Sequence, residues 1–330
     1  MTVRAKILGL AVSTLALVVM IGVSLGVGSA LLPLSTVWDA LVAPEGGIDH
    51  NTILQVRVPR TILAVLVGAA LAVAGAVIQA LTRNPLADPG ILGVNSGASF
   101  AIVLGVAFLG ITHVSQYLWL GFIGAVVSGL LVYAISGRGK ATPVRLTLVG
   151  VALSSVFMGM SQTLTLIDPD TFDRMRFWAA GSVADRPSGT IAGVVGFIVV
   201  GLIVALACAR PLNALALGDE LATAVGSRIA ITRTVGFAAV TILCGAATAA
   251  AGPIAFVGLM IPHTVRWLTG PDQRWILPFT LILGPVLMLV SDVIGRLLIW
   301  PAELQVGIIT ALAGAPVLII MVRRARTGNL

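Results

Sequence analysis

Long apolar runs separated by short polar stretches fill almost the whole chain. A helix of about 20 apolar residues crosses the hydrocarbon core of a bilayer, and about ten runs approach or reach that length. Their approximate limits are 7–32, 61–82, 92–111, 117–136, 144–167, 190–209, 232–251, 254–268, 275–298 and 304–322. The pattern predicts an all-α, polytopic membrane protein with about ten transmembrane helices. Because little sequence remains between the runs, residues 1–330 are expected to form a single transmembrane domain.

The composition agrees with this fold class. Hydrophobic residues make up 58% of the 330 residues, charged residues make up 10%, and the mean hydropathy is +1.07. These values lie outside the range of soluble globular chains. Arg4 and Lys6 before the first run, with "GSA" at 28–30, resemble a signal peptide. The run is longer than the usual signal core, so we expect a retained helix.

Charged residues in the loops predict the orientation, because Lys and Arg accumulate on the cytoplasmic side of membrane proteins. With the N- and C-termini in the cytoplasm, the inner face carries 14 basic and four acidic residues, and the outer face carries six basic and nine acidic residues. The net charge of +7 therefore reflects topology. It gives no indication of nucleic acid as a partner.

Three arginines lie outside on this topology, against the general trend. Arg57 and Arg60, in "QVRVPR", precede the second span, and Arg296 lies near the end of the ninth. One interpretation is interfacial anchoring, with the aliphatic stems in lipid and the guanidinium groups among the headgroups. For Arg296 another is pairing with Asp292, which lies four residues earlier on the same helix face.

Two eight-residue stretches nearly repeat: GAALAVAG at 68–75 and GAATAAAG at 245–252, with six identical positions. Such low-complexity matches also arise by chance. Small residues nevertheless let membrane helices approach closely, and the two spans run in opposite directions on the predicted topology. The pattern favours halves related by an inverted repeat, an arrangement found in transporters.

The stretch 81–100, "LTRNPLADPGILGVNSGASF", cannot be one continuous helix, since Pro85 and Pro89 each remove a backbone donor. It is either a plain connection between two helices or part of a gate. Its polar residues next to the membrane favour a gate, because such groups need protein or a water-filled passage around them. These residues are Asn84, Asp88, Asn95 and Ser96.

The longest cytoplasmic connection, 210–231, contains "LGDELATAVGSRI". Asp219 and Glu220 suit the N-terminus of a short helix, and Gly226 is placed to close it. Three apolar positions then share one helix face: Leu221, Ala224 and Val225. This short helix lies either on the membrane surface or against a partner protein.

Five ordered blocks carry a resemblance to a known family. They are RVPR with GAALAVAGAVIQALTRNPLADPGILGVNSGA, then GDELATAVG, GPIAFVGLMIPHTVRW and PAELQVGIITALAGAPVLI. The chain resembles the FecCD family of ABC importer permeases, the transmembrane subunits of type II importers for iron-siderophores, haem and cobalamin. The resemblance implies ten helices per subunit and a passage between two such subunits. It also implies a pair of cytoplasmic ATPases, which bind ATP and Mg, and an external substrate-binding protein.

The resemblance also implies roles for particular positions. GDELATAVG is similar to the coupling helix that contacts the ATPase, with Asp219, Glu220, Ala222 and Gly226 in the loop 210–231. NPLADPG is similar to the segment that closes the cytoplasmic end of the passage, with Asn84 and Leu86 in the gating positions. Arg57, Arg60 and Arg296 resemble the basic pockets that receive acidic residues of the binding protein.

The resemblance implies a gating role for one loop between spans but not for another. The external loop 168–189 matches a region that forms a short helix over the outer mouth, with Phe172, Phe177 and Trp178 as its gating residues. The loop between the fourth and fifth spans holds polar residues in the cobalamin member of the family. This chain has Pro143 and Val144 there, so no gating role is assigned to that loop.

No other chemistry is indicated. The three histidines, His50, His113 and His263, lie far apart without a metal-binding spacing, and Cys208 and Cys244 lie in separate spans as small packing residues. No Walker A motif occurs, so any ATP hydrolysis belongs to a partner. We therefore predict no catalytic residues, no metal site and no cofactor in this chain.

The expected function is that of a permease subunit that carries a metal-chelate, most simply an iron-siderophore, inward across the bacterial cytoplasmic membrane by alternating access. Haem or cobalamin is the alternative cargo. A secondary transporter should place ionisable residues at mid-membrane, and an intramembrane enzyme should show clustered catalytic groups. The sequence shows neither. Its expected partners are a second permease subunit, identical or paralogous, two ATPase subunits, an external binding protein or lipoprotein, and the lipid bilayer.

Overall fold

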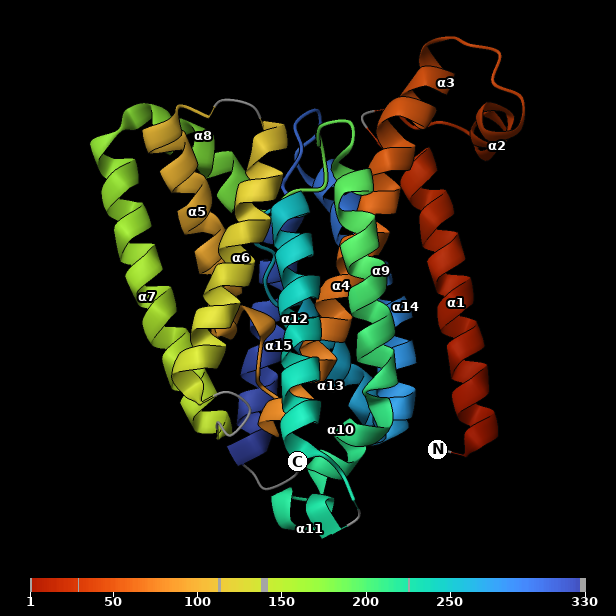
Figure 1. Ribbon diagram of the computed structural model, residues 1–330. Coiled ribbons are helices and arrows are strands. Elements are labelled where there is room, and N and C mark those ends of the chain that lie inside the picture. The colour runs from red at the N-terminus through yellow and green to blue at the C-terminus, as the bar shows by residue number, and fades with distance from the viewer. Residues whose placement is uncertain (1, 29, 112–113, 138–141, 225, 327–330) are drawn as a thin grey trace.

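The structure, a computed structural model, describes residues 2–28, 30–111, 114–137, 142–224 and 226–326. Within these residues the regular structure is all helical (Figure 1). The helices in the first half are α1 (Val3–Gly26), α2 (Leu34–Val42), α3 (Ile48–Asn51), η1 (Thr52–Arg57), α4 (Val58–Thr82), η2 (Pro89–Leu92), α5 (Val94–Leu109), α6 (Val114–Ser136) and α7 (Pro143–Ile167). Those in the second half are α8 (Pro169–Ala179), α9 (Thr190–Ala207), α10 (Ala209–Ala216), α11 (Asp219–Ala224), α12 (Ile229–Ala251), α13 (Val257–Thr269), α14 (Gln273–Leu298) and α15 (Val306–Arg326).

Ten of these helices correspond to the ten predicted spans. In the described part of the chain, seven helices are long and apolar enough to cross a membrane, and α5 and α15 are shorter apolar helices. The tenth, α13, has 13 residues and occupies the place of the eighth predicted run. The all-α, polytopic fold class is therefore confirmed.

The two ends of the helix bundle differ. Figure 1 shows α2, α3 and α8 at one end, called the outer end below, and α11 with the N-terminus of α1 at the opposite, inner end. The C-terminal end of α15 also lies toward the inner end. The first residues of α1 and the last residues of α15 thus lie on one side of the bundle, as the loop charges predicted.

The centre of the bundle is α4, whose most apolar window is 83% buried. Glycine residues let α4 pack closely against α14 and α13. A Cβ on Gly68 would lie 2.7 Å from the carbonyl oxygen of Gly284 in α14, and one on Gly75 would lie 1.9 Å from that of Gly258 in α13. Only residues without a side chain allow these two crossings, so the first copy of the Gly/Ala repeat is a packing surface.

The second copy of the repeat lies on α12, whose window is 78% buried. After each copy the chain turns and starts a shortened helix, α5 after α4 and α13 after α12. Both turns use a left-handed residue, Gly93 (φ 75°) before α5 and Phe256 (φ 70°) before α13. In Figure 1, α5 occupies the outer half of the bundle and α13 the inner half. This arrangement agrees with the predicted inverted halves.

Two boundaries differ from the sequence prediction. The first helix ends at Gly26 and not near residue 32, because Val27 leaves the helical conformation (φ −98°, ψ 132°). The second span begins earlier than predicted, because α3, η1 and α4 form one 35-residue helix, 48–82, with a π-helical segment at Thr52–Arg57. Periodicity placed the apolar core of that helix correctly but not its polar extension.

Candidate docking, coupling and gating sites

Arg57 lies in the π-helical segment and is buried, with 4% of its surface exposed. Its guanidinium donates hydrogen bonds to the carbonyl oxygens of Leu25 (2.8 Å), Gly26 (2.7 Å) and Ala30 (2.6 Å). The last carbonyls of a helix lack partners within the helix and carry partial negative charge. Arg57 therefore caps the C-terminus of α1 from a neighbouring helix.

Arg296, on α14, caps the same helix end and is 2% exposed. Its guanidinium donates to the carbonyl oxygens of Ser24 (2.8 Å) and Val27 (2.7 Å). It also pairs with Asp292, four residues earlier. The pairing that the helical spacing indicated is thus present.

Arg60 is the third member of this group and lies nearer the surface. Its guanidinium binds both carboxylate oxygens of Asp292, the shortest contact being 2.8 Å, and it pairs with Glu303 at 2.7 Å. Glu303 is about one third exposed, at 34% of its side chain. We call Arg57, Arg60, Asp292, Arg296 and Glu303 the outer arginine cluster.

The contacts of the outer arginine cluster bear on lipid anchoring but not on docking of the binding protein. Interfacial anchoring in lipid is wrong for Arg57 and Arg296, because their guanidinium groups are buried in protein. Docking of a binding protein stays a prediction. In this structure Arg60 and Glu303 are the members closest to solvent.

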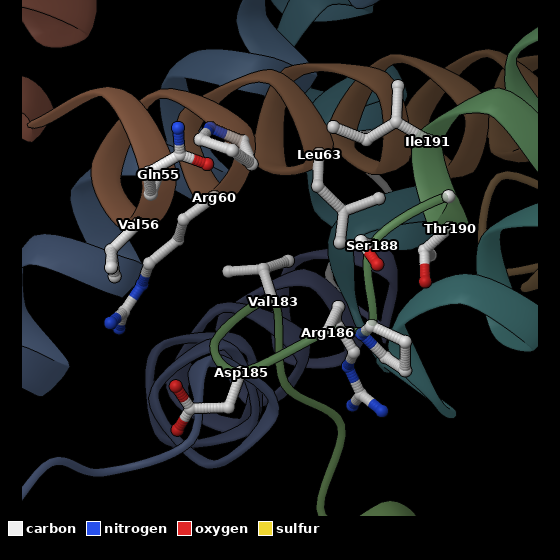
Figure 2. A pocket seen from close by; sticks show the side chains of 13 residues that line it. Gln55, Val56, Arg60, Leu63, Val183, Asp185, Arg186, Ser188, Thr190 and Ile191 are labelled. Atoms are coloured by element: carbon white, nitrogen blue, oxygen red, sulfur yellow. The ribbon is translucent and has the colours of Figure 1, made fainter. Parts of the chain in front are cut away.

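A pocket of about 430 Å³ opens beside Arg60, and the sequence did not indicate it. Figure 2 shows the start of α4 on one side and the segment 183–191 on the other. Arg186, on that segment, donates to the carbonyl oxygens of Ser182 and Ala251, each at 2.9 Å. Burial lowers its pKa to about 10, against the opposing effect of Asp185. The side chain stays cationic at neutral pH, and Asp185 also lines the pocket, so the lining carries charges of both signs.

At the inner end, α11 projects from the bundle (Figure 1). Gly218 (φ 103°) precedes it and Gly226 (φ 79°) follows it, and the Gly226 amide donates to the Thr223 carbonyl at 2.9 Å. Gly226 thus closes the helix, as predicted. Ala222 is fully buried, whereas Leu221 is 59% exposed, and Glu220 is exposed too. The face that contains Leu221 has no cover within the described chain. Val225 lies outside the described residues.

The gate segment lies directly after α4. Asn84 is exposed and Leu86 half-buried, and the Leu86 amide donates to Asn84 Oδ1 at 2.9 Å, which closes a tight turn. Asp88 then accepts a hydrogen bond from the Gly90 amide at 2.8 Å and caps η2. The two predicted gating residues are therefore adjacent at the inner end. Their role as a gate remains a prediction.

The external loop contains α8, the short helix that the family resemblance implied. Phe172 is 50% exposed on α8, whereas Trp178 is 4% exposed and packs into the core. The carbonyl oxygen of Trp178 lies where a Cβ on Gly252 would stand, at 2.4 Å. The side chain of Phe177 lies outside the described residues. The structure does not bring Phe172 and Trp178 together on one surface, so Phe172 is the better candidate for an external gate.

Exposed faces of two outer helices differ in polarity. On α1 the exposed positions Leu8, Val12, Leu15 and Val19 are all apolar and follow helical spacing, as expected for contact with lipid tails. On α7 the exposed face is mixed, because Ser155, Gly159 and Gln162 lie between the exposed apolar residues Leu148, Val151 and Leu166 at the same kind of spacing. An exposed glutamine in a span is unfavourable against lipid. This face of α7 is therefore suited to water or to protein.

A broad hollow of about 790 Å³ lies at the surface formed by α5, the end of α8, the segment between α12 and α13, and α15. Its lining is almost entirely small or apolar, including Gly307, Ala311 and Leu312 of α15. Asn95, at the start of α5, is its one polar side chain, and its Oδ1 accepts a hydrogen bond from Thr248 at 2.7 Å. The hollow offers space for a bulky molecule and few specific contacts.

These features can now be set beside known proteins. Residues 16–324 match the FecCD transport family. The chain belongs to this family. It is 48% identical over 317 residues to the ferric enterobactin transport system permease protein FepD of Escherichia coli K12, covering 96% of this chain and 95% of that protein. It is 42% identical over 314 residues to the iron(3+)-hydroxamate import system permease protein FhuB of Bacillus subtilis, covering 92% of this chain and 80% of FhuB.

A solved structure supports the same assignment. An inward-facing metal-chelate type ABC transporter chain superposes with a TM-score of 0.83 and 31% identity, over 96% of this chain and 98% of the other. The FecCD chain described here is thus a multi-pass transport permease of the ABC importer type and not an enzyme, as the sequence predicted. Among the described residues, no group of three or more His, Cys, Asp or Glu could hold a metal ion.

Proposed function

We propose that this FecCD permease carries ferric siderophores inward across the bacterial cytoplasmic membrane, driven by two ATPase subunits that bind ATP and Mg. One polar position on the exposed face of α7 carries the proposal, because the side-chain amide of Gln162 needs a neighbour other than lipid, whereas the Ser155 hydroxyl already donates to the Val151 carbonyl at 3.0 Å. A second permease, identical or paralogous, facing α7 and α15 across a water-filled passage supplies that neighbour. The relatives named for ferric enterobactin and iron(3+)-hydroxamate support a siderophore as cargo.

Alternating access in this assembly follows from the two ends of the permease. An external binding protein delivers the chelate at the outer end, near Arg60 and the pocket beside it. The hollow on α5 and α15 then gives passage without tight binding, since its lining is mostly small and apolar. The gate segment with Asn84 and Leu86 closes the inner end, and α11 contacts the ATPase.

Uptake by the reconstituted complex tests the substrate and the energy source. The permease, its ATPase and its binding protein are placed in proteoliposomes, with ferric enterobactin as the probe. We expect accumulation that requires ATP hydrolysis and that haemin and cyanocobalamin do not compete away. Competition by haemin or cyanocobalamin would support the alternative cargo. Uptake that an ion gradient drives without ATP would instead identify a secondary transporter.

The contact of α11 with the ATPase can be tested at Gly226. A Cβ there meets no atom within 4 Å in the described chain, although φ is +79°. Gly226→Ala therefore adds only backbone strain, whereas Gly226→Trp adds the same strain plus a large side chain on the projecting segment, where we expect the ATPase to bind. We expect Trp, but not Ala, to abolish co-purification of the ATPase or uncouple its hydrolysis from uptake. Equal behaviour of the two variants would contradict the contact.

Labelling of single cysteines tests the orientation. The native cysteines Cys208 and Cys244 are buried, so background labelling should be low. We expect a cysteine at Gly47, between α2 and α3, to react with an impermeant thiol reagent in intact cells. One at Thr223, on α11, should react only after the cells are permeabilised. The reverse result would exchange the outer and inner ends and overturn the proposed roles.

A further inference from the structure

The carboxylate of Asp219, the first residue of α11, binds two arginines from different helices. Arg233, on α12, donates to both of its oxygens at 3.1 and 3.0 Å, and Arg83, at the end of α4, pairs with the same group. Desolvation is the largest single effect on Asp219 and opposes its ionisation, but the hydrogen bonds and charges of Arg83 and Arg233 together outweigh it and lower the pKa. The carboxylate is therefore charged at neutral pH. We call Arg83, Asp219 and Arg233 the inner arginine cluster.

Arg83 occupies an unusual backbone position. It ends α4 in the left-handed conformation, with φ 51°. Glycine normally fills such a position, because any Cβ is strained there. The side chain of Arg83 offers a reason for its presence, since its Nε donates to the carbonyl of Leu215 on α10 at 2.8 Å while its other end reaches Asp219.

The residue after Arg83 is Asn84, the first of the two predicted gating residues. The turn after α4 thus contains both Arg83, whose guanidinium binds α11, and Asn84, which begins the gate segment. Elsewhere α11 is held loosely, as Ala222 is its one buried residue in the described chain. A helix with few buried contacts can move at low cost, so its motion passes to the bundle through a small number of side chains.

We propose that Arg83 is a positioning residue that links α11 to the gate segment. Because Arg83 is paired with Asp219, a movement of α11 moves Asn84 and Leu86 with it. This rests on the proposed function of α11 as the ATPase contact. The pair is exposed, at 34% for Arg83 and 48% for Asp219. Such pairs contribute little to stability and are readily broken and remade, which suits a joint that moves in every transport cycle.

The test measures chelate imported per ATP hydrolysed, with the complete complex in proteoliposomes and ferric enterobactin as the probe. In Arg83→Gln we expect normal permease abundance, normal co-purification of the ATPase and near-normal hydrolysis. The import per ATP should fall by roughly tenfold, inside the range of about 5- to 150-fold that is typical of coupling between sites. Asp219→Asn should give a similar loss, and the double variant should be little worse than either single one, because the two residues act as one unit.

Arg233→Gln is the matched control. It removes a guanidinium from the same carboxylate but leaves the connection to the gate segment, so import per ATP should stay within about twofold of the wild type. An unchanged ratio in Arg83→Gln, or additive losses in the double variant, would overturn the inference. Equal loss of abundance, hydrolysis and uptake in Arg83→Gln would also overturn it, since Arg83 would then only support the fold. Absence of ATP-driven uptake in the wild type would instead refute the proposed function.

Discussion

The outer and inner arginine clusters use the same residue type in opposite surroundings. In the outer cluster, Arg57 and Arg296 are almost completely buried, and their main acceptors are carbonyl groups at the end of α1. In the inner cluster, both arginines bind the carboxylate of Asp219, Arg83 also donates to the Leu215 carbonyl, and the pair of Arg83 with Asp219 is exposed to solvent. The first arrangement holds one helix against two others. The second connects elements whose relative position can change.

The difference follows from the energetics of charge in protein. A buried charge has lost its hydration, so removing its partner leaves a large penalty uncompensated. An exposed pair keeps much of its hydration and is screened by salt, so its loss is tolerated. Arginine suits both places because its planar guanidinium offers five donors, enough to bind several acceptors at once. Substitutions should therefore have large effects on stability at the outer end and small ones at the inner end.

The largest effect is expected at Asp292, which binds both Arg60 and Arg296. Asp292→Ala removes the carboxylate bound to Arg296 and one of the two carboxylates bound to Arg60, in a nearly solvent-free site. Breaking a buried pair in this way typically costs about 3–5 kcal/mol. We expect severe loss of the protein from the membrane and a much lower unfolding temperature in detergent. Asp39→Ala, at an exposed acid on α2, is the control and should leave both quantities nearly unchanged.

A smaller effect is expected at Arg57, which also separates its two possible roles. Lys cannot reproduce the fork that reaches three carbonyls, but these acceptors are neutral and stay near water-accessible chain, so we expect a net loss close to that of one hydrogen bond to a charged group, about 1.5–3 kcal/mol. If Arg57 mainly holds α1, Arg57→Lys and Arg57→Gln should both lower thermal stability and expose the loop after α1 to protease. Their affinity for the binding protein should change little once folded protein is selected.

The docking role gives the opposite pattern at the same residue. A guanidinium that leaves its carbonyls to bind a carboxylate of the binding protein should make Arg57→Glu abundant but weak in docking. Loss of a desolvated charge pair costs about 2–5 kcal/mol, or roughly thirtyfold or more in affinity. The dissociation constant of the binding protein for permease in nanodiscs, measured beside permease abundance, distinguishes the two roles. Normal abundance of Arg57→Glu with weak docking would show that Arg57, like the inner cluster, acts in a contact that changes and does not mainly stabilise the fold.

Sequence reasoning located the elements of both clusters but not what the outer one binds. Apolar runs gave the helices, and turn chemistry gave the end of α11 at Gly226, because both signals are local. The acceptors of Arg57 lie 27 to 32 residues away, at the end of α1 and just after it, and are backbone carbonyls, which carry no side-chain signature. The spacing of Asp292 and Arg296 did indicate their pairing, since that contact lies within one helix.

Two further features differ in whether the sequence contains a signal for them. The polar face of α7 was visible as Ser155, Gly159 and Gln162 at helical spacing, inside a run classed simply as apolar. Mean hydropathy conceals such a face, whereas its periodicity reveals it. The left-handed conformation of Arg83 had no such signal, because glycine is the residue that usually marks it. That position depends on tertiary contacts with α10 and α11.

The smallest effect is expected at Glu303, where the outer cluster meets solvent. Glu303→Gln removes one of the two acids bound to Arg60, but Asp292 remains, and the lost pair is partly hydrated. Exposed pairs typically contribute about 0.2–1 kcal/mol, so thermal stability should barely change, in contrast to Asp292→Ala. The residual effect should also shrink as salt rises, because the Debye length falls from about 10 Å at 0.1 M to about 3 Å at 1 M. Unfolding temperatures of the wild type and both variants at these two salt concentrations provide the measurement. A loss of thermal stability in Glu303→Gln as large as that in Asp292→Ala, and equally insensitive to salt, would show that Glu303 is also buried in the membrane-embedded protein.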